Sequence, residues 1–533
     1  MTRLSNQEGL AEWLPRSLAE EHPVVTVIGD AILDGWWDGL IERFCREAPA
    51  PVVEIGHRDF APGGAANTAM NLAALGADVR LVSIIGEDTA GRELTARLAA
   101  AGVDTRYLVT HADMVTSTKY RISSGGQLLL RLDDAASEIP ARALDELGAM
   151  VPGAVATSDA VVLCDYAAGA LDGEVRARLL ETLAERDGML LVVDAHDPAR
   201  WSQLRPDLAT PNAREAAQLL GTKWPSGPER SSAVESRGTE LLDASGAVAV
   251  VVTLDRDGTI TLTAADGTHQ AEHRASGSSQ AVATHRAVVA HRTWARPEVE
   301  KQASGAGDTF VAALTMARVV GLPLTTSLDL AQAAADVVVH RPGTSVCSTE
   351  ELCRHIAQFA ETALLAGELE QQIEAHRRDG HRIVLTNGCF DVLHRGHTRY
   401  LNQAKQLGDV LIVAINSDAS VRELKGPDRP VNPEADRAAV IAALSCVDYV
   451  TVFDTPTPIP LIDLLQPDVY AKGGDYTPEM LAETEAVERY GGTVAILDYV
   501  PEHSTTAVLE RIRTAGEGSG TADGEGEAAV VDG

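Results

Sequence analysis

The sequence predicts an α/β protein with two α/β domains in succession. Its 533 residues are enough for several domains at about 150 residues each. Short apolar runs alternate with Ala- and Leu-rich helical stretches from Val24 onward, and the same alternation starts again at Arg382. Short β-rich runs separated by helical segments are typical of parallel sheets covered by helices.

The first half contains the longer α/β pattern. The stretch 116–132 alternates like a hairpin with its turn at Gly125-Gly126, which predicts a lid inserted in the domain. Residues 266–300 are rich in His, Ala, Ser and Gln without a period, and we expect a weakly structured loop insertion there. The expected strands are Val24–Ile28, Ala160–Leu163, Met189–Val193 and Val248–Val252, and two of the expected helices are Arg92–Ala101 and Glu174–Glu185.

The second half repeats the pattern on a smaller scale. Helical spacing over residues 357–378 predicts a link between the domains, and the Gly/Glu-rich end predicts a disordered acidic tail. The expected strands are Ile383–Thr386, Val410–Ile415, Tyr449–Val452 and Val494–Asp498. The expected divisions are a leader over 1–22, a first domain over 23–355, a helical linker over 356–380, a second domain over 381–515 and the tail over 516–533.

Charge and cysteine content exclude several function classes. Asp and Glu number 77 against 45 Lys and Arg, and the net charge is −32, which argues against binding nucleic acid or an anionic membrane. The six cysteines form no CxxC pair, which argues against a zinc ribbon or a disulfide framework. The N-terminus has no apolar core, and no apolar run approaches 18 residues, so we expect a cytoplasmic protein.

Two Gly-rich segments predict a phosphate site in the first domain. One is Pro62–Asn71, and the other is SGAGDTF, Ser304–Phe310, which opens a helical stretch. Free backbone N–H groups at a helix start favour phosphate, and Asp308 in the first turn could take a proton from an attacking hydroxyl. Taken alone, GAGD is also an ordinary helix start with a favourable acidic residue.

The order of these motifs resembles the ribokinase-like carbohydrate kinases over roughly residues 23–355. It runs from Gly29-Asp30 through PGGAAN, TPNARE (210–215) and VTLDRDG (252–258) to GAGD. GDAILD (29–34), EAPAPVV (47–53) and the STKYRI and QLLLRLD segments within 117–133 resemble the heptose 7-phosphate kinases in particular. The resemblance implies a three-layer α/β kinase domain with a small β lid.

The same resemblance implies the roles of individual residues. Asp308 would be the base that activates the anomeric hydroxyl, and Gly305, Ala306 and Gly307 would form the anion hole. The implied sugar contacts are Asp30, Gly63, Gly64 and Asn67, and the implied ATP-binding residues are Asn212, Ala213, Arg214, Glu215, Thr253 and Gly258. Three positions depart from the family pattern: Ala168 stands where Lys is usual, and Ala195-His196 where Pro-Lys is usual. A lost Lys removes a charge that could hold a sugar phosphate.

The second domain opens on TNGCFDVLHRGHTRYL at 386–401. His394 and His397 are spaced to lie on one face at a helix start, where they could stabilise charge on a nucleotide phosphate, and Gly396 lets the backbone approach closely. A solvated helix face and half of a metal site are the alternatives for such a His pair. A third zinc ligand at suitable spacing is missing from the sequence.

This string resembles the cytidylyltransferase-like nucleotidyltransferases, and more closely the heptose 1-phosphate adenylyltransferases. Similar motifs extend over 380–514 and include NSDASVRELKG (416–426), RPVNPEADR (429–437), PDVYAKGGDY (467–476) and HSTTAVLERI (503–512). The resemblance implies a Rossmann-like HxGH domain. The implied nucleotide-binding residues are Thr386, Asn387, Gly388, Phe390, Asp391, Lys425, Arg437, Lys472, Ser504, Thr505 and Thr506. Lys425 and Arg437 could equally be surface charges, and the STT cluster only a helix cap.

Together the resemblances imply a bifunctional enzyme of ADP-heptose synthesis that uses ATP at both sites. Mg²⁺ is expected with the nucleotide, and not from protein ligands alone. The expected partners are a small phosphosugar and ATP, with a homodimer through the kinase domain and no nucleic acid or membrane. Two alternatives stay open: another phosphosugar or CTP as substrate, or a transferase joined to a silent kinase-like domain.

Overall fold

A computed structural model describes the chain at residues 10–134, 138–227, 229–265, 287–295, 305–339, 341, 343–357, 364, 366–427, 429–474, 477 and 480–497. The chain divides into two compact units, Met1–Phe359 and Ala360–Gly533. Ser304, the Ser504–Thr506 cluster and the predicted acidic tail lie outside the described residues.

The first unit is built on a nine-stranded sheet in the order β13-β12-β11-β10-β9-β8-β1-β4-β5. The strands from β5 to β11 run parallel, whereas β12 and β13 are antiparallel additions at one edge. Its strands are β1 (Val24–Gly29), β4 (Asp78–Gly86), β5 (Leu108–His111), β8 (Ala160–Asp165), β9 (Leu190–Ala195), β10 (Leu208–Ala209), β11 (Ala249–Thr253), β12 (Thr259–Ala264) and β13 (Val288–Thr293). Apolar side chains are buried along the central strands, which explains the apolar runs that predicted them.

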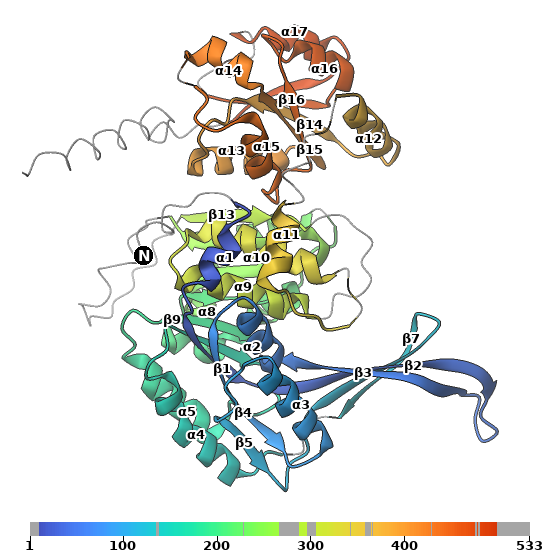
Figure 1. The fold of residues 1–533 in the computed structure, drawn as a ribbon, viewed down its shortest axis with the longest axis vertical. Coiled ribbons are helices and arrows are strands. Elements are labelled where there is room, and N and C mark those ends of the chain that lie inside the picture. Colours follow the sequence, from blue (N-terminus) through green and yellow to red (C-terminus); the bar gives the residue numbers. More distant parts are fainter. Residues whose placement is uncertain are drawn as a thin grey trace, which may run out of the picture. The chain divides into compact units, whose positions relative to one another are not determined.

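Helices cover both faces of this sheet. On one face, α4 and α5 share a core with β1, β8, β9 and Trp201. On the other, α9 contacts β8 and β9 and lies between α2 and α10 (Figure 1). The helices of this unit are α1 (Leu14–Ala19), α2 (Ala65–Ala74), α3 (Thr89–Ala100), α4 (Ala141–Val155), α5 (Gly173–Ala184), α6 (Ala213–Leu219), α7 (Glu229–Ser236), α8 (Gly238–Ser245), α9 (Ala306–Val319), α10 (Leu324–Val339) and α11 (Thr349–Ala357), with short 3₁₀ helices η1 (Pro198–Leu204) and η2 (Asp255–Asp257).

A separate four-stranded sheet, ordered β3-β2-β6-β7, projects from this unit as an arm (Figure 1). The predicted hairpin is present as β6 (Thr118–Ser124) and β7 (Gln127–Asp134), with Gly125 and Gly126 both at positive φ in the turn. The sequence did not predict the longer hairpin beside it, β2 (Ala31–Phe44) with β3 (Pro51–Gly64). The arm is one layer thick, so its strands lack the continuous burial that marks a core strand.

The second unit is a five-stranded parallel sheet in the order β16-β15-β14-β17-β18. The chain runs outward from β14 in one direction to β16 and then returns to the other side of β14. The strands are β14 (Ile383–Gly388), β15 (Val410–Asn416), β16 (Tyr449–Phe453), β17 (Val469–Gly473) and β18 (Thr493–Leu497). The helices are α12 (Ala366–Arg378), α13 (Arg395–Lys405), α14 (Asp418–Lys425), α15 (Glu434–Ala442), α16 (Ile459–Leu465) and α17 (Glu483–Glu488).

Two segments differ from their sequence-based description. The insertion predicted as a loop over 266–300 contains β13, which pairs with β12 along its full length. The helix expected to link the domains, α12, buries Leu369 and Ile373 in the same core as β14. All six cysteines are free. Within the described ranges, no helix is long and apolar enough to cross a membrane.

Candidate functional sites

The first candidate site surrounds the start of α9. Gly305 caps this helix at φ +86°, and a Cβ there would meet Asn67 Nδ2 and Thr344 Cγ2 at 2.9 Å. A Cβ on Gly307 would meet nothing within 4 Å, so this turn is open on that side. The helix therefore presents free N–H groups of the GAGD turn, beside the Asp308 carboxyl, to an approaching anion.

Asp308 is held by two side chains from other elements. Its Oδ2 accepts a hydrogen bond from Asn67 Nδ2 at 2.8 Å, and its Oδ1 lies 3.2 Å from the Tyr166 hydroxyl. Burial raises the pKa of Asp308 to about 7, and the negative charges of Asp194 and Asp34 act in the same direction. A carboxyl with this pKa is suited to accept a proton near neutral pH.

Of the predicted sugar contacts, Gly63 and Gly64 lie beside Asn67, whereas the carboxylate of Asp30 is bonded to the protein backbone. Gly63 lies against the Asp34 carboxylate, because a Cβ there would meet Asp34 Oδ2 at 2.3 Å. Asp34 itself pairs with Arg121 Nη1 at 2.8 Å and accepts from Thr344 Oγ1 at 3.3 Å. Gly64, at φ +58°, lies over the Tyr166 ring, so both glycines allow close approach beside Asn67 and Asp308.

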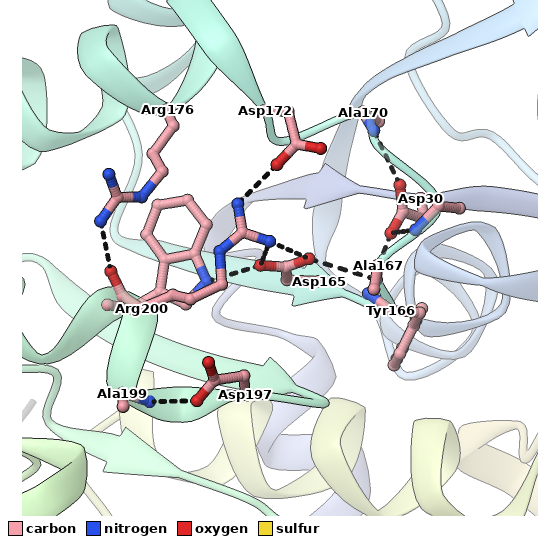
Figure 2. A network of polar contacts seen from close by, with 12 residues as sticks. Asp30, Asp165, Tyr166, Ala167, Ala170, Asp172, Arg176, Asp197, Ala199 and Arg200 are labelled. Carbon is pink, nitrogen blue, oxygen red and sulfur yellow. Dashed lines mark hydrogen bonds and ion pairs between the residues drawn. The ribbon is translucent and has the colours of Figure 1, made fainter. Parts of the chain in front are cut away.

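Asp30 is engaged by the protein backbone. Its two carboxylate oxygens accept hydrogen bonds from the N–H groups of Tyr166, Ala168 and Ala170 at 2.9–3.0 Å (Figure 2). The side chain is buried, and burial raises its pKa in spite of these donors. Asp30 therefore holds the loop after β8, and Ala168, the position of the missing Lys, contributes its N–H to that arrangement.

The predicted nucleotide stretch forms the start of α6. Asn212 and Glu215 make a reciprocal capping box, with Asn212 Oδ1 accepting from Glu215 N at 3.0 Å and Glu215 Oε2 accepting from Asn212 N at 2.8 Å. Ala213 and Arg214 follow, and Arg214 is exposed. Asn212 also pairs with Thr253 in a β-bridge, so these two predicted residues are neighbours.

The backbone conformation and the close approach of β13 require glycine at position 258. At φ +81° its Cβ would meet the Thr293 carbonyl oxygen at 2.0 Å, so a larger residue would displace β13. His196 follows β9, and its Nδ1 lies 2.6 Å from Glu215 Oε1. The hydrogen bond to Glu215 raises the pKa of His196, so a positive charge is favoured where the related kinases usually carry Lys.

The second candidate site lies where the strand order of the second unit reverses, between β14 and β17. Ligands of open parallel sheets bind outside the carboxyl ends of the strands at such a point. The turn after β14 carries Phe390 and Asp391, and β17 carries Lys472. His394 caps α13, with its Nδ1 accepting from Gly396 N at 3.1 Å, and His397 lies in the first turn of that helix.

The two histidines form a stacked pair, with ring centroids 3.9 Å apart. Burial, together with the neighbouring His394 and Lys425, lowers the pKa of His397 to about 3. Among the described residues, Nδ1 of His397 has no hydrogen-bond partner. Lys425 ends α14 and is exposed, so its charge faces the pair from a second helix.

Asn387 and Lys472 bridge the two strands at the reversal. Lys472 Nζ donates to Asn387 Oδ1 at 2.9 Å, and the Tyr470 hydroxyl donates to the same oxygen at 2.6 Å. Burial lowers the pKa of Lys472. A cation held at the carboxyl end of β17 is placed to meet a phosphate in this crevice.

Other residues predicted to bind nucleotide are used within the protein. Thr386 is buried and bonded to the Tyr400 hydroxyl. Phe390 is at φ +44° with its ring against Gly388 and 5.3 Å from the His397 ring. These contacts shape the turn after β14.

Asp391 and Arg437 are likewise used within the protein. Asp391 is buried, pairs with Arg429, and accepts from Val431 N at 2.6 Å. Arg437 is not a surface charge: it is buried, and its guanidinium donates to Asn432 O, Cys389 O and Asp418 Oδ1 at 2.6–3.0 Å. Both residues therefore hold the turn that carries the histidines.

Sequence reasoning missed Asp34, Tyr166 and Asp194 in the first site. Tyr166 directly follows β8 and Asp194 is the last residue but one of β9, and the two meet because β8 and β9 are adjacent in the sheet. Their one signal was position after an apolar strand, where polar residues gather in parallel sheets. Within the described ranges, no group of three His, Cys, Asp or Glu residues could hold a metal ion.

Comparison with known proteins agrees with both halves. Residues 25–351 match the pfkB family of carbohydrate kinases, and residues 385–511 match the cytidylyltransferase-like family. Bifunctional protein HldE of Hahella chejuensis is 36% identical over 494 residues, covering 92% of this chain and 96% of that protein. Its counterpart in Chromohalobacter salexigens is 38% identical over 501 residues, covering 92% and 97%.

The fold and the two sites define an enzyme in which a carbohydrate kinase and a nucleotidyltransferase share one chain. The chain belongs to the family of the bifunctional HldE proteins, which it matches over nearly its whole length.

Proposed function

We propose that this enzyme makes ADP-heptose in two steps. The first unit transfers a phosphoryl group from ATP to the C1 hydroxyl of D-glycero-β-D-manno-heptose 7-phosphate. After a separate phosphatase removes the 7-phosphate, the second unit joins heptose 1-phosphate to AMP from a second ATP and releases pyrophosphate. The observation that carries the proposal is the Asp308 carboxyl at the open start of α9, with its pKa raised to about 7.

In the kinase step, Asp308 accepts the C1 hydroxyl proton as that oxygen attacks the γ-phosphorus of ATP. The N–H groups of Gly305, Ala306 and Gly307 lie at the positive end of α9 and stabilise the charge on the transferred group. Asn67 fixes one carboxylate oxygen, which leaves the base oriented. Mg²⁺ enters as the MgATP substrate and neutralises phosphate charge.

In the transferase step, the sugar phosphate attacks the α-phosphorus of ATP. His394 and His397 lie beside the start of α13, where hydrogen bonds to phosphate oxygens stabilise the charge that develops. Lys472 supplies a positive charge from the adjoining strand. Lys425, Ser504, Thr505 and Thr506 are further proposed contacts to the nucleotide phosphates.

A coupled assay of the full chain tests both steps. We expect wild type to phosphorylate heptose 7-phosphate with MgATP, Asp308→Asn to lose this step, and both to convert heptose 1-phosphate to ADP-heptose. His397→Asn should show the reverse pattern. Loss of both steps in wild type would overturn the heptose assignment.

Another phosphosugar is the second candidate substrate, because Ala168 and His196 replace two usual lysines. A panel of sugar phosphates with ATP and CTP distinguishes the candidates. If a different sugar phosphate or CTP gives a higher kcat/KM than the heptose and ATP, the two-site mechanism stands and the substrate is reassigned.

We propose further that the enzyme is a cytoplasmic homodimer joined through the lid. Strand β7 exposes four leucines, Leu128, Leu129, Leu130 and Leu132, and β2 exposes Leu40, Ile41 and Phe44. Apolar side chains exposed on an arm one layer thick favour a second copy of the same arm. Light scattering should give a dimer for wild type and a monomer for Leu130→Glu; a wild-type monomer would refute this.

A further inference from the structure

The hydroxyl of Tyr166 joins two carboxyl groups of the kinase site. It lies 2.5 Å from Asp194 Oδ2 and 3.2 Å from Asp308 Oδ1. We propose that Tyr166 and Asp194 are positioning residues that set the proton affinity of the base Asp308 through this shared hydroxyl. The inference rests on the proposed role of Asp308, and it assigns a task to two residues that the mechanism above leaves unused.

The arrangement of protons explains why the three groups act together. A phenol has one proton to donate, so it can serve only one ionised carboxylate at a time. The other carboxyl then lacks a donor and carries an unpaired negative charge, unless it is itself protonated and donates to the phenol oxygen. Protonation of Asp308 therefore changes the proton affinity of Asp194, and the two carboxyls titrate as a coupled pair.

The loop that carries Tyr166 is fixed from two sides, so its hydroxyl has a defined place (Figure 2). On one side, Asp30 accepts the backbone N–H groups of this loop. On the other, Arg200 lies between Asp165 and Asp172, at 3.2 Å and 2.5 Å, and Asp165 also accepts from Trp201 Nε1 at 2.9 Å. A hydrogen bond can set the pKa of a base only if its donor is held in a fixed position, and these contacts hold the loop that carries Tyr166.

Asp194 is anchored independently of Tyr166. Its Oδ1 accepts from Thr210 Oγ1 at 2.9 Å, which leaves Oδ2 for the tyrosine. Burial raises the pKa of Asp194 to about 6 and that of Asp308 to about 7; the charge of Glu215 also raises the pKa of Asp194, and the charge of Asp194 also raises that of Asp308. Burial also raises the pKa of Tyr166, so this residue stays a phenol.

The charged and titratable groups around the trio come from several elements. Asp34 in β2 faces Asp308, and Cys164 in β8 faces Tyr166. Glu215 in α6 and His196 after β9 face Asp194, and they form an ion pair with each other when His196 is protonated. Lys119 in β6 acts on His196. Of the two carboxylates that raise the pKa of Asp308, Asp194 has the larger effect, and it is joined to Asp308 through Tyr166.

Two substitutions should shift the pKa of Asp308 in opposite directions. Asp194→Asn removes a negative charge and leaves the tyrosine proton to Asp308, so the pKa of Asp308 falls. Tyr166→Phe removes a donor to the Asp308 carboxylate, so its pKa rises. The kinase kcat/KM of the full chain, measured against pH, reports this group in the free enzyme.

We expect the acid limb of the profile to shift to lower pH in Asp194→Asn and to higher pH in Tyr166→Phe. Tyr166→Phe should also lower kcat by about tenfold, with KM for the sugar changed far less. Tyr107→Phe, in the same unit but beside Arg106, is the matched control and should leave the profile unchanged. If the acid limb of the profile lies at the wild-type pH in both variants, the proposal is overturned.

A stability measurement tests the coupling without activity. All six tryptophans, Trp13 to Trp294, lie in the first unit, so tryptophan fluorescence of the full chain follows that unit alone. A carboxyl with a raised pKa destabilises the fold progressively as pH rises through that value, so Asp308→Asn and Asp194→Asn should each raise the unfolding midpoint more at about pH 8.5 than at about pH 6.

The double variant decides whether the two carboxyls are coupled. If they repel each other through Tyr166, its gain at about pH 8.5 is smaller than the sum of the two single gains. Additive gains would overturn the proposal even if no kinase activity is detected. Absent kinase activity with a non-additive gain would instead reject the proposed substrate and keep the coupling.

Discussion

The imidazole rings of His394 and His397 stack with their centroids 3.9 Å apart and their planes 29° apart. Burial lowers the pKa of His397 to about 3, and the repulsion that two imidazolium ions would feel at this distance acts in the same direction. His397 is therefore neutral near pH 7 in the free protein. A polyphosphate beside it would favour the protonated form.

His397→Asn should reduce adenylyl transfer on the order of a hundredfold, the usual effect of removing one donor to a developing oxyanion. The kinase activity of the same preparation should be unchanged. His381→Asn is the control, because His381 lies in the same unit, is exposed and contacts His376 rather than the pair. Equal losses in both variants would show that the effect is structural.

The pH dependence of the kinase is a second prediction. Because the pKa of Asp308 is raised to about 7, the base form is lost as pH falls through that value, and kinase kcat/KM should fall about tenfold per pH unit below it. The kcat/KM of the transferase step, measured in the same samples, should not show this fall. A flat kinase profile between about pH 5.5 and 8 would contradict the role of Asp308 as base.

Strands β1, β8, β9, β11, β14, β15 and β16 could be predicted because they are mostly buried on both faces. The run before Asp30 and the run before Thr386 are apolar for this reason, and each continues into the residues of a site. The motifs also placed Asp308 and the His pair at helix starts, because glycine and the capping residue leave a local signature in the sequence.

Strand β17 was missed because its buried run, Val469–Ala471, is only three residues long, and other missed features lack such signatures. Strand β13 is an edge strand whose residues are mostly half-buried or exposed, and its sequence VVAHRT has no alternation. Asp391 and Arg437 stand in motifs that predict nucleotide binding, and the sequence did not indicate that both also bond to neighbouring backbone groups. The contact of Tyr166 with Asp194 arises from strand order, which the sequence of neither segment records.

His196 gives a third prediction. Its bond to Glu215 raises its folded pKa, so the stability that this pair contributes is present below the unfolded value of about 6.5 and is lost as pH rises through the folded pKa. Lys at this position would keep its charge. His196→Lys should therefore flatten the fall of the tryptophan-detected midpoint between about pH 6.5 and 9, whereas His57→Lys, on the exposed face of β3, should not. A parallel fall in all three proteins would count against the His196–Glu215 pair.

Asp391 gives the last prediction, and it separates a structural residue from a nucleotide contact. Its carboxylate is buried against Arg429 and the Val431 N–H, so Asp391→Ala leaves a largely buried cation and a backbone donor without this acceptor. Removing one partner of a buried ion pair costs about 3 kcal/mol or more, and we expect a loss of this size in the second unit. Far-ultraviolet circular dichroism would show it as an earlier unfolding transition of the full chain. Tryptophan fluorescence, confined to the first unit, should not change. Unchanged stability with a raised KM for ATP in the transferase step would instead make Asp391 a nucleotide contact.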